Sequence, residues 1–180
     1  MNPLLGIIAS QNYPRVVNSY ESIATVLVGS GGSAQIDFTS IPSTFKHLQL
    51  RYIYQGAGEF LMTMNGDNTT SNYIRHFVYG NGSSVSAGRQ DTPAYVGYMD
   101  SVATSSFSGG ICDILDYTNT NKQRVVRTLV GNDRNGTGDI VFYSGMPKSS
   151  TTAISSLRLV LSSGLNIAQY SHFALYGIKG

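Results

Sequence analysis

The chain contains 180 residues, a length that suits one domain with a well-formed core. Charged residues make up only 12% of it, against about 25% in a typical globular protein, and the formal net charge is +2. So weak and scattered a charge argues against a nucleic-acid groove or an anionic membrane as partner. The shortage of Glu and Lys argues against solvated helices.

The first 18 residues predict an N-terminal arm rather than a targeting signal. The apolar run at 4–9 has no Lys or Arg before it, is interrupted by Gly6, and is shorter than the roughly 7–15 residues of a secretory signal core. No other run approaches the roughly 18 apolar residues of a membrane helix. We therefore expect a soluble chain made in a cytoplasm, with Pro14 separating the arm from a first strand near Ser19.

After the arm, apolar and polar residues alternate in nine segments, a pattern that is typical of half-buried antiparallel strands. The expected strands lie at 20–28, 33–39, 46–55, 59–67, 111–117, 123–130, 140–143, 156–163 and 171–178. The short GAG at 56–58 predicts a hairpin between two of them. Because a single sheet would leave one face and two long edges uncovered, we expect an all-β fold. Its expected form is an antiparallel two-sheet β-sandwich, most commonly a jelly roll.

The least regular part of the chain runs from Tyr79 to Gly110. It is rich in Gly, Ser and Asn, and strand-like alternation resumes on both sides of it without a run of charge. We therefore expect a long surface excursion at about 79–110 within a single β-sandwich domain at 19–180, not a linker between two domains.

The segment DRNGTGD at 133–139 spaces its oxygen-bearing side chains like the early ligands of a calcium loop. Asp133, Asn135 and Asp139 occupy these positions, but Ser144 stands where the closing bidentate Glu belongs. Clusters of Asn, Asp and Gly are also what a tight connection between strands requires. We therefore favour a plain turn without metal, and these three residues are only a weak metal candidate.

The sequence predicts no catalytic site and no cofactor. Asp113 and Asp116 lie three apart on an expected strand, so their side chains point to opposite faces and cannot act together as acid and base. The histidines lie outside any G-x-S-x-G or H-E-x-x-H motif, and GSGGSA at 29–34 precedes a strand instead of the helix that a dinucleotide site needs. The lone Cys112 excludes an intrachain disulfide, and its apolar neighbours favour a buried, inert thiol.

Four stretches carry a likeness to known proteins: SYESIATVLVGSGGSAQIDFTSIPSTFKHLQLRYIYQ at 19–55, RHFVYGNGSSVSAG at 75–88, DILDYTNTNKQRVVRTLVG at 113–131 and LVLSSGLNIAQYSHFALYGIKG at 159–180. Together they resemble a recurrent family of virion structural proteins of tailed bacteriophages. The resemblance implies a β-sandwich on the phage particle, either a capsid cement (decoration) protein or a piece of a fibre or tail. It supplies no catalytic residues.

The resemblance also implies a role for the arm, because cement proteins commonly pin themselves to neighbouring capsid subunits with a terminal segment. The expected docking residues are Leu4, Leu5, Ile7, Ile8, Tyr13 and Arg15. Full burial of each large aliphatic side chain would contribute about 1.5–3 kcal/mol to docking. The alternative is that LLGII is an edge strand of the protein's own sandwich.

We therefore expect a non-enzymatic capsid cement protein of the virion that stabilises the phage head by bridging capsid subunits. Its expected partners are the major capsid protein and copies of itself, with a trimer favoured, and neither nucleic acid nor membrane. The alternative is a tail or fibre module that binds host surface saccharide through loops bearing tyrosine, since tyrosine combines an apolar ring with a polar hydroxyl.

Overall fold

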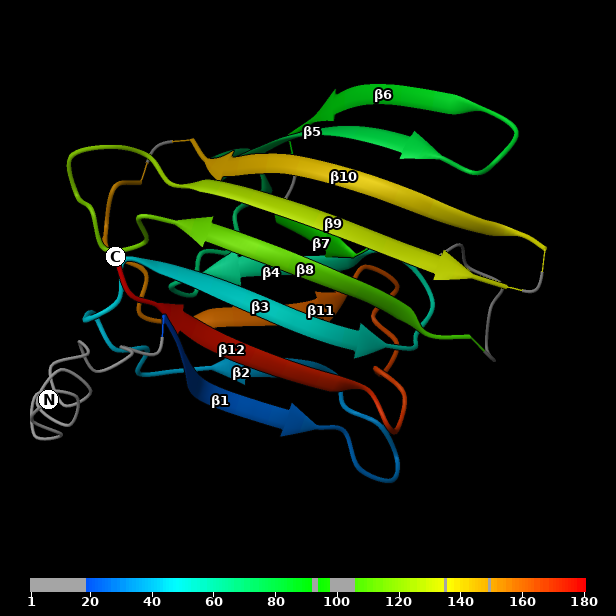
Figure 1. The fold of residues 1–180 in the computed structure, drawn as a ribbon, viewed down its shortest axis with the longest axis horizontal. Helices are drawn as coiled ribbons and strands as arrows, with labels where there is room; N and C mark the ends of the chain where they lie inside the picture. The colour runs from blue at the N-terminus through cyan, green and yellow to red at the C-terminus, as the bar shows by residue number, and fades with distance from the viewer. Residues whose placement is uncertain (1–18, 92–93, 98–105, 135, 149) are drawn as a thin grey trace, which may run out of the picture.

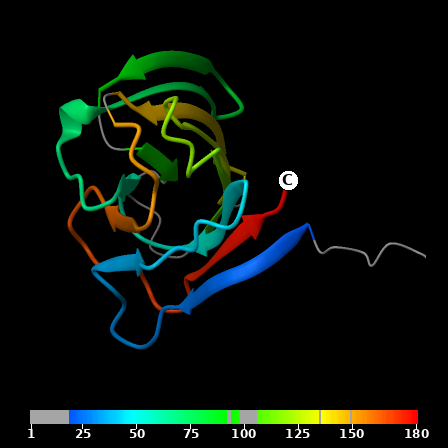
Figure 2. The ribbon, with the colours of Figure 1, turned by 90° about the vertical axis from the view of Figure 1, so that its left-hand side faces the viewer.

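A computed structural model describes residues 19–91, 94–97, 106–134, 136–148 and 150–180. These residues form twelve strands and one short 3-10 turn, η1 (Thr70–Asn72). The strands pair antiparallel in two sheets that face each other as two layers (Figures 1 and 2). The antiparallel two-sheet β-sandwich that the alternation predicts is confirmed.

The larger sheet has eight strands and the smaller one has four. The large sheet runs in the order β1 (Tyr20–Leu27), β12 (His172–Ile178), β3 (His47–Tyr54), β8 (Ser108–Leu115), β9 (Val125–Asp133), β10 (Gly138–Pro147), β5 (Tyr73–Gly80) and β6 (Val85–Gln90). The small sheet runs in the order β2 (Gln35–Phe38), β11 (Leu157–Leu161), β4 (Phe60–Met64) and β7 (Ala94–Gly97). The chain changes sheet at every step except from β5 to β6, from β8 to β9 and from β9 to β10.

The core lies between the two sheets and is built from every second residue of the facing strands. On β3 the inward residues are Leu48, Leu50, Tyr52 and Tyr54, all of them buried. The ring of Tyr54 stacks on Phe60 of β4 with centroids 4.6 Å apart, and Phe60 in turn lies 5.4 Å from Phe173 of β12. Each such aromatic pair contributes about 0.5–1.5 kcal/mol to stability beyond the contribution of its buried area. These rings therefore hold β3, β4 and β12 together.

Two hairpins make the large sheet wider than the small one. One is β9–β10, which continues the sheet from β8, and the other is β5–β6, which pairs with β10. The small sheet ends at β7, whose backbone packs across β8, β9, β10 and β5. The edge strand β6 lies one strand further out than β5, past the strands that β7 packs across.

In the stretch at about 79–110, where the sequence predicts a long surface excursion, the structure describes several strands. This stretch holds the end of β5, all of β6 and β7, and the start of β8, while residues 92–93 and 98–105 lie outside the described part. β6 escapes sequence analysis because it is an edge strand exposed on both faces, so it shows no burial-driven alternation. β5, which begins before this stretch, is also absent from the expected strands, so the count rises from nine to twelve.

The predicted hairpin at GAG is wrong. β3 belongs to the large sheet and β4 to the small one, so residues 56–58 carry the chain from one layer to the other. The short loop and its glycines suit a hairpin equally well, because a local sequence does not specify which strand will pair with which. The predicted jelly-roll form of the sandwich stays a prediction.

Candidate functional site

The outer face of the large sheet carries a row of exposed apolar side chains, here called the apolar row. Its four members lie directly opposite one another on neighbouring strands: Ile111 on β8, Leu129 on β9, Phe142 on β10 and Val78 on β5. Each is between 44% and 50% exposed. Contiguous apolar surface of this kind marks interaction sites on soluble proteins, whereas single exposed residues do not.

A shallow depression of 330 Å³ adjoins the apolar row on the same face. Glycines form its floor, because Gly109 of β8 lies opposite Gly131 of β9, which lies opposite Ile140 of β10. A Cβ on Gly109 would meet no atom within 4 Å, so this glycine leaves open space above the sheet. The depression, here called the outer depression, is lined by these glycines and by aliphatic residues, among them Ile111, Leu129 and Ile140.

Polar residues border the apolar row on its other side. Gln49 donates a 2.8 Å hydrogen bond to Asp113, and Arg127 lies 4.0 Å from the same carboxylate. This polar line continues across β10 and β5, where Ser144 lies opposite Arg127 and His76 lies opposite Ser144. The outer face is thus apolar in its middle and polar beside it, which is the arrangement of many protein interfaces.

The opposite, inner face of the widened sheet holds a second feature, a groove of 290 Å³ that we call the inner groove. It is built on three neighbouring strands, β10, β5 and β6, with Glu59 approaching from the start of β4. Across β5 and β6 the inward pairs are Arg75 with Gln90, Phe77 with Gly88 and Tyr79 with Ser86. The Phe77 ring lies so close to Gly88 that a Cβ there would come within 2.8 Å of it. Gly88 therefore leaves room for the Phe77 ring, which lines the groove.

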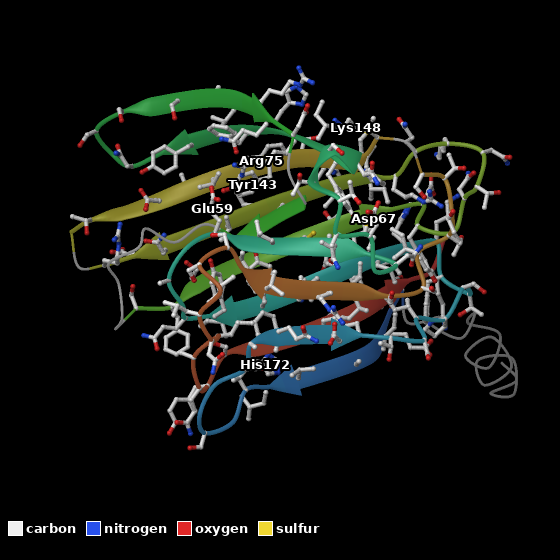
Figure 3. All side chains as sticks on the ribbon, turned by 180° about the vertical axis from the view of Figure 1, so that it is seen from behind. Glu59, Asp67, Arg75, Tyr143, Lys148 and His172 are labelled. Carbon is white, nitrogen blue, oxygen red and sulfur yellow. The ribbon has the colours of Figure 1, made fainter. Side chains whose placement is uncertain are left out.

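Arg75 is the central polar residue of the inner groove and is only 3% exposed. Its guanidinium lies 5.3 Å from the ring centroid of Phe77 and 5.2 Å from that of Tyr143, both within cation–π range. It also lies 3.5 Å from Glu59 and donates a hydrogen bond to the Gln90 side chain. Figure 3 shows Glu59, Arg75 and Tyr143 gathered at one place, far from His172 of β12.

The weak metal candidates are not brought together. The segment 133–139 joins the paired strands β9 and β10, as expected of a turn. Asp139 on β10 lies directly opposite Asn132 on β9, so their side chains share one face of the sheet. Asp133 is the next residue on β9, and its carboxylate therefore points to the other face. Asp139 is buried, accepts a 2.5 Å hydrogen bond from the Tyr79 hydroxyl and pairs with Arg134 at 3.2 Å. Asn135 lies outside the described residues.

The other residues that the sequence singles out are also dispersed. β8 ends at Leu115, so Asp116 is not on the strand as expected but in a turn with a φ of 49°. Asp116 there pairs with Lys46 at 3.0 Å and with Lys122, and its backbone N–H donates to His47 Nδ1. The described residues contain no group of three or more His, Cys, Asp or Glu side chains placed to hold a metal ion.

Cys112 is fully buried on β8, and burial raises the pKa of its thiol to about 12. A thiol with this pKa carries almost no thiolate at neutral pH, which is the reactive form. The expectation of a buried thiol is confirmed. The docking residues Leu4, Leu5, Ile7, Ile8, Tyr13 and Arg15 all lie outside the described part of the chain.

Sequence analysis missed both the apolar row and the inner groove. One signal for the row is present in the sequence, because β9 has apolar residues on both faces: Val126 and Val130 point inward and Leu129 outward. A strand that is apolar on both faces indicates that both are covered. The inner groove has no such local signal, since Glu59 and Arg75 meet only through the packing of the two sheets.

No protein-family model, curated protein or solved structure matches the chain. Among the described residues, no helix has the length and apolar character needed to cross a bilayer.

Proposed function

We propose that this chain is a non-enzymatic structural protein of a tailed-bacteriophage particle, and specifically a cement protein that bridges capsid subunits. The observation that carries the proposal is the apolar row with its outer depression on the outer face of the large sheet. A cement protein needs a broad contact surface and many modest contacts rather than a reactive site. The resemblance of four long stretches to phage virion proteins supports the same role.

The apolar row is suited to association after folding. Its side chains are about half exposed, so covering what remains of each is worth roughly 1 kcal/mol. Four such contacts, together with the outer depression and the polar residues beside it, supply a docking surface for copies of the chain and for the major capsid protein. A trimer is the oligomer that we favour, because capsid shells offer threefold positions.

We further propose that the sandwich is a jelly roll widened by two hairpins. Without β5, β6, β9 and β10, the sheets read β1-β12-β3-β8 and β2-β11-β4-β7. Along the chain these eight strands alternate between the two sheets except from β4 to β7, which are neighbours in the small sheet. This is the arrangement of two nested Greek keys. Viral capsid domains are among the proteins with this architecture, which agrees with a place on the particle.

The test of the cement role is a matched pair of leucine variants. Leu129 in the apolar row is 50% exposed and Leu165, on the β11–β12 connection, is 59% exposed. We expect Leu129→Gln to weaken incorporation into phage particles by up to about tenfold and Leu165→Gln to leave it unchanged, because only the first removes apolar contact area from the docking face. Both variants should melt like the parent, since neither side chain is buried in the core.

The predicted docking arm is tested by deleting residues 1–15. We expect the melting temperature of the isolated protein to stay within a few degrees, at about 2–4 °C per kcal/mol for a domain of this size, while incorporation falls sharply. Unfolding of the truncated protein would instead assign LLGII to the sandwich. If the deletion and Leu129→Gln both leave incorporation unchanged, the cement role is wrong.

The second candidate is a tail or fibre module that binds host surface saccharide. The inner groove favours it, since the groove combines aromatic rings with hydrogen-bonding side chains. The number of copies in purified virions separates the two candidates. Hundreds of copies per particle are expected of a cement protein, whereas a few to a few dozen are expected of a fibre.

A further inference from the structure

The inner groove exists because the large sheet outgrows the small one. β7 packs across β5 but the sheet continues past it to the edge strand β6, so the inner face at the β5–β6 hairpin is only partly covered by the small sheet. Two glycines allow close packing beside the groove: Gly88, opposite Phe77, and Gly145, opposite Arg75. At both positions a Cβ would come within 2.8 Å of neighbouring atoms. The groove is thus formed mainly by residues of the paired strands β5, β6 and β10.

The charge at the centre of the inner groove is already balanced. Glu59 lies 3.5 Å from the buried Arg75 guanidinium, and the faces of Phe77 and Tyr143 lie within cation–π distance of it. A cation that has a carboxylate beside it does not require an anionic ligand to offset its desolvation. The chemistry of the groove therefore favours a ligand without net charge.

The side chains that remain partly exposed in the groove are of two kinds. Phe77 and Tyr79 present aromatic rings, and Glu59, Ser86 and Gln90 present hydrogen-bonding groups. Aromatic rings pack against apolar C–H faces, while carboxylate, hydroxyl and amide groups fix the orientation of hydroxyls. A pyranose ring has both surfaces, with C–H groups on its faces and hydroxyls around its rim.

We infer that the inner groove binds a neutral saccharide, with the sugar ring against Phe77 and Tyr79 and its hydroxyls toward Glu59, Ser86 and Gln90. Arg75 acts as a positioning residue that holds Glu59 and Gln90 at the rim. These residues lie on strands β5 and β6 and at the start of β4. They do not lie on loops that bear tyrosine, where the sequence analysis places saccharide binding. The inference does not depend on the cement role, because it concerns the isolated protein.

The test is a titration of the isolated full chain followed by NMR. The probes are glucose, galactose, mannose and N-acetylglucosamine as neutral sugars, with galacturonate as a charged comparison. We expect at least one neutral sugar to shift the Gln90 side-chain amide and the Arg75 Nε–H signals in a saturable way, and galacturonate to bind more weakly because it brings a carboxylate next to Glu59.

A matched pair of variants on β6 locates the site. Ser86 faces the inner groove, whereas its neighbour Ala87 faces the outer side, opposite Val78. Ser86→Ile should fill the groove and weaken sugar binding at least tenfold, while Ala87→Ile adds the same side chain on the other face and should leave binding unchanged. Both residues are exposed on an edge strand, so neither change should prevent folding.

Three outcomes would overturn the inference. The first is that none of the neutral sugars shifts these signals near its solubility limit. The second is that galacturonate binds best, which would make the groove an anion site. The third is that Ser86→Ile and Ala87→Ile behave alike, which would place any binding elsewhere. None of these outcomes bears on particle incorporation, so failure here is distinct from failure of the cement role.

Discussion

The hydroxyl of Tyr79 on β5 donates a 2.5 Å hydrogen bond to Asp139 Oδ1 on β10, and Arg134 lies 3.2 Å from the other carboxylate oxygen. Both oxygens of Asp139 are therefore engaged by the protein itself. The side chain is buried, and it ties the β9–β10 turn to the neighbouring strand. The residue that sequence analysis considered as a metal ligand is thus a structural hydrogen-bond acceptor.

The first prediction follows from these contacts. Asp139→Ala should lower the free energy of unfolding by about 1–3 kcal/mol, because it removes the two hydrogen bonds that the buried carboxylate accepts from Tyr79 and Arg134. Asp133→Ala, the matched change on the exposed side of the same turn, should cost less than about 0.5 kcal/mol. Urea unfolding followed by circular dichroism measures both.

The same turn should not respond to calcium. Asp133 and Asp139 leave opposite faces of the sheet, so millimolar calcium should not change the melting temperature. If calcium raised it, and the two alanine changes together abolished that rise, the turn would be a metal site after all.

The second prediction concerns two consecutive glycines on β8. A Cβ on Gly110 would collide with the ring and hydroxyl of Tyr52, its partner on β3, whereas a Cβ on Gly109 would meet nothing within 4 Å. Gly110→Ala should therefore destabilise the protein by about 1–3 kcal/mol through overpacking, and Gly109→Ala should leave its stability nearly unchanged.

Thermal melts of these two glycine variants provide the measurement, and at this chain length 1 kcal/mol corresponds to about 2–4 °C. Equal melting temperatures would show that Tyr52 moves aside without cost. Gly109→Ala has a second use, because it partly fills the outer depression and should weaken incorporation into particles without affecting folding.

The third prediction is a pH dependence that arises at Asp116. Hydrogen bonds from Lys122 and Lys46 lower the pKa of this carboxyl from 3.8 to about 2. A carboxyl whose pKa is lower in the folded state contributes stability above its unfolded pKa, and that contribution is lost as the pH falls toward the folded value. The Asp116 contribution should therefore be complete above about pH 4 and disappear by about pH 2.

Asp116→Asn isolates this contribution. The melting temperature of the parent should fall more steeply than that of the variant between about pH 4 and pH 2, and the two curves should run parallel at neutral pH. Lys46 and Lys122 are more than half exposed, so added salt should reduce the difference. Curves that stay parallel down to pH 2 would mean that these ion pairs do not lower the pKa of Asp116.

Several features of this protein follow from its sequence alone. The strands were predictable where apolar residues fill the buried face, as in β3, because burial of alternate residues gives the sequence a period of two. β5 was not, since its buried positions include the charged Arg75. The inert character of Cys112 was predictable from its apolar neighbours. β6 was not, since an edge strand exposed on both faces carries no such period.

Tertiary structure alone decided the rest. GAG at 56–58 suits a hairpin, yet β3 and β4 lie in different sheets, because strand partners are chosen by burial across the whole domain rather than by the connecting loop. Asp133 and Asp139 are close in sequence but leave opposite faces of the sheet. Ile111 and Phe142 are far apart in sequence but lie in one row, because antiparallel registers align them through Leu129.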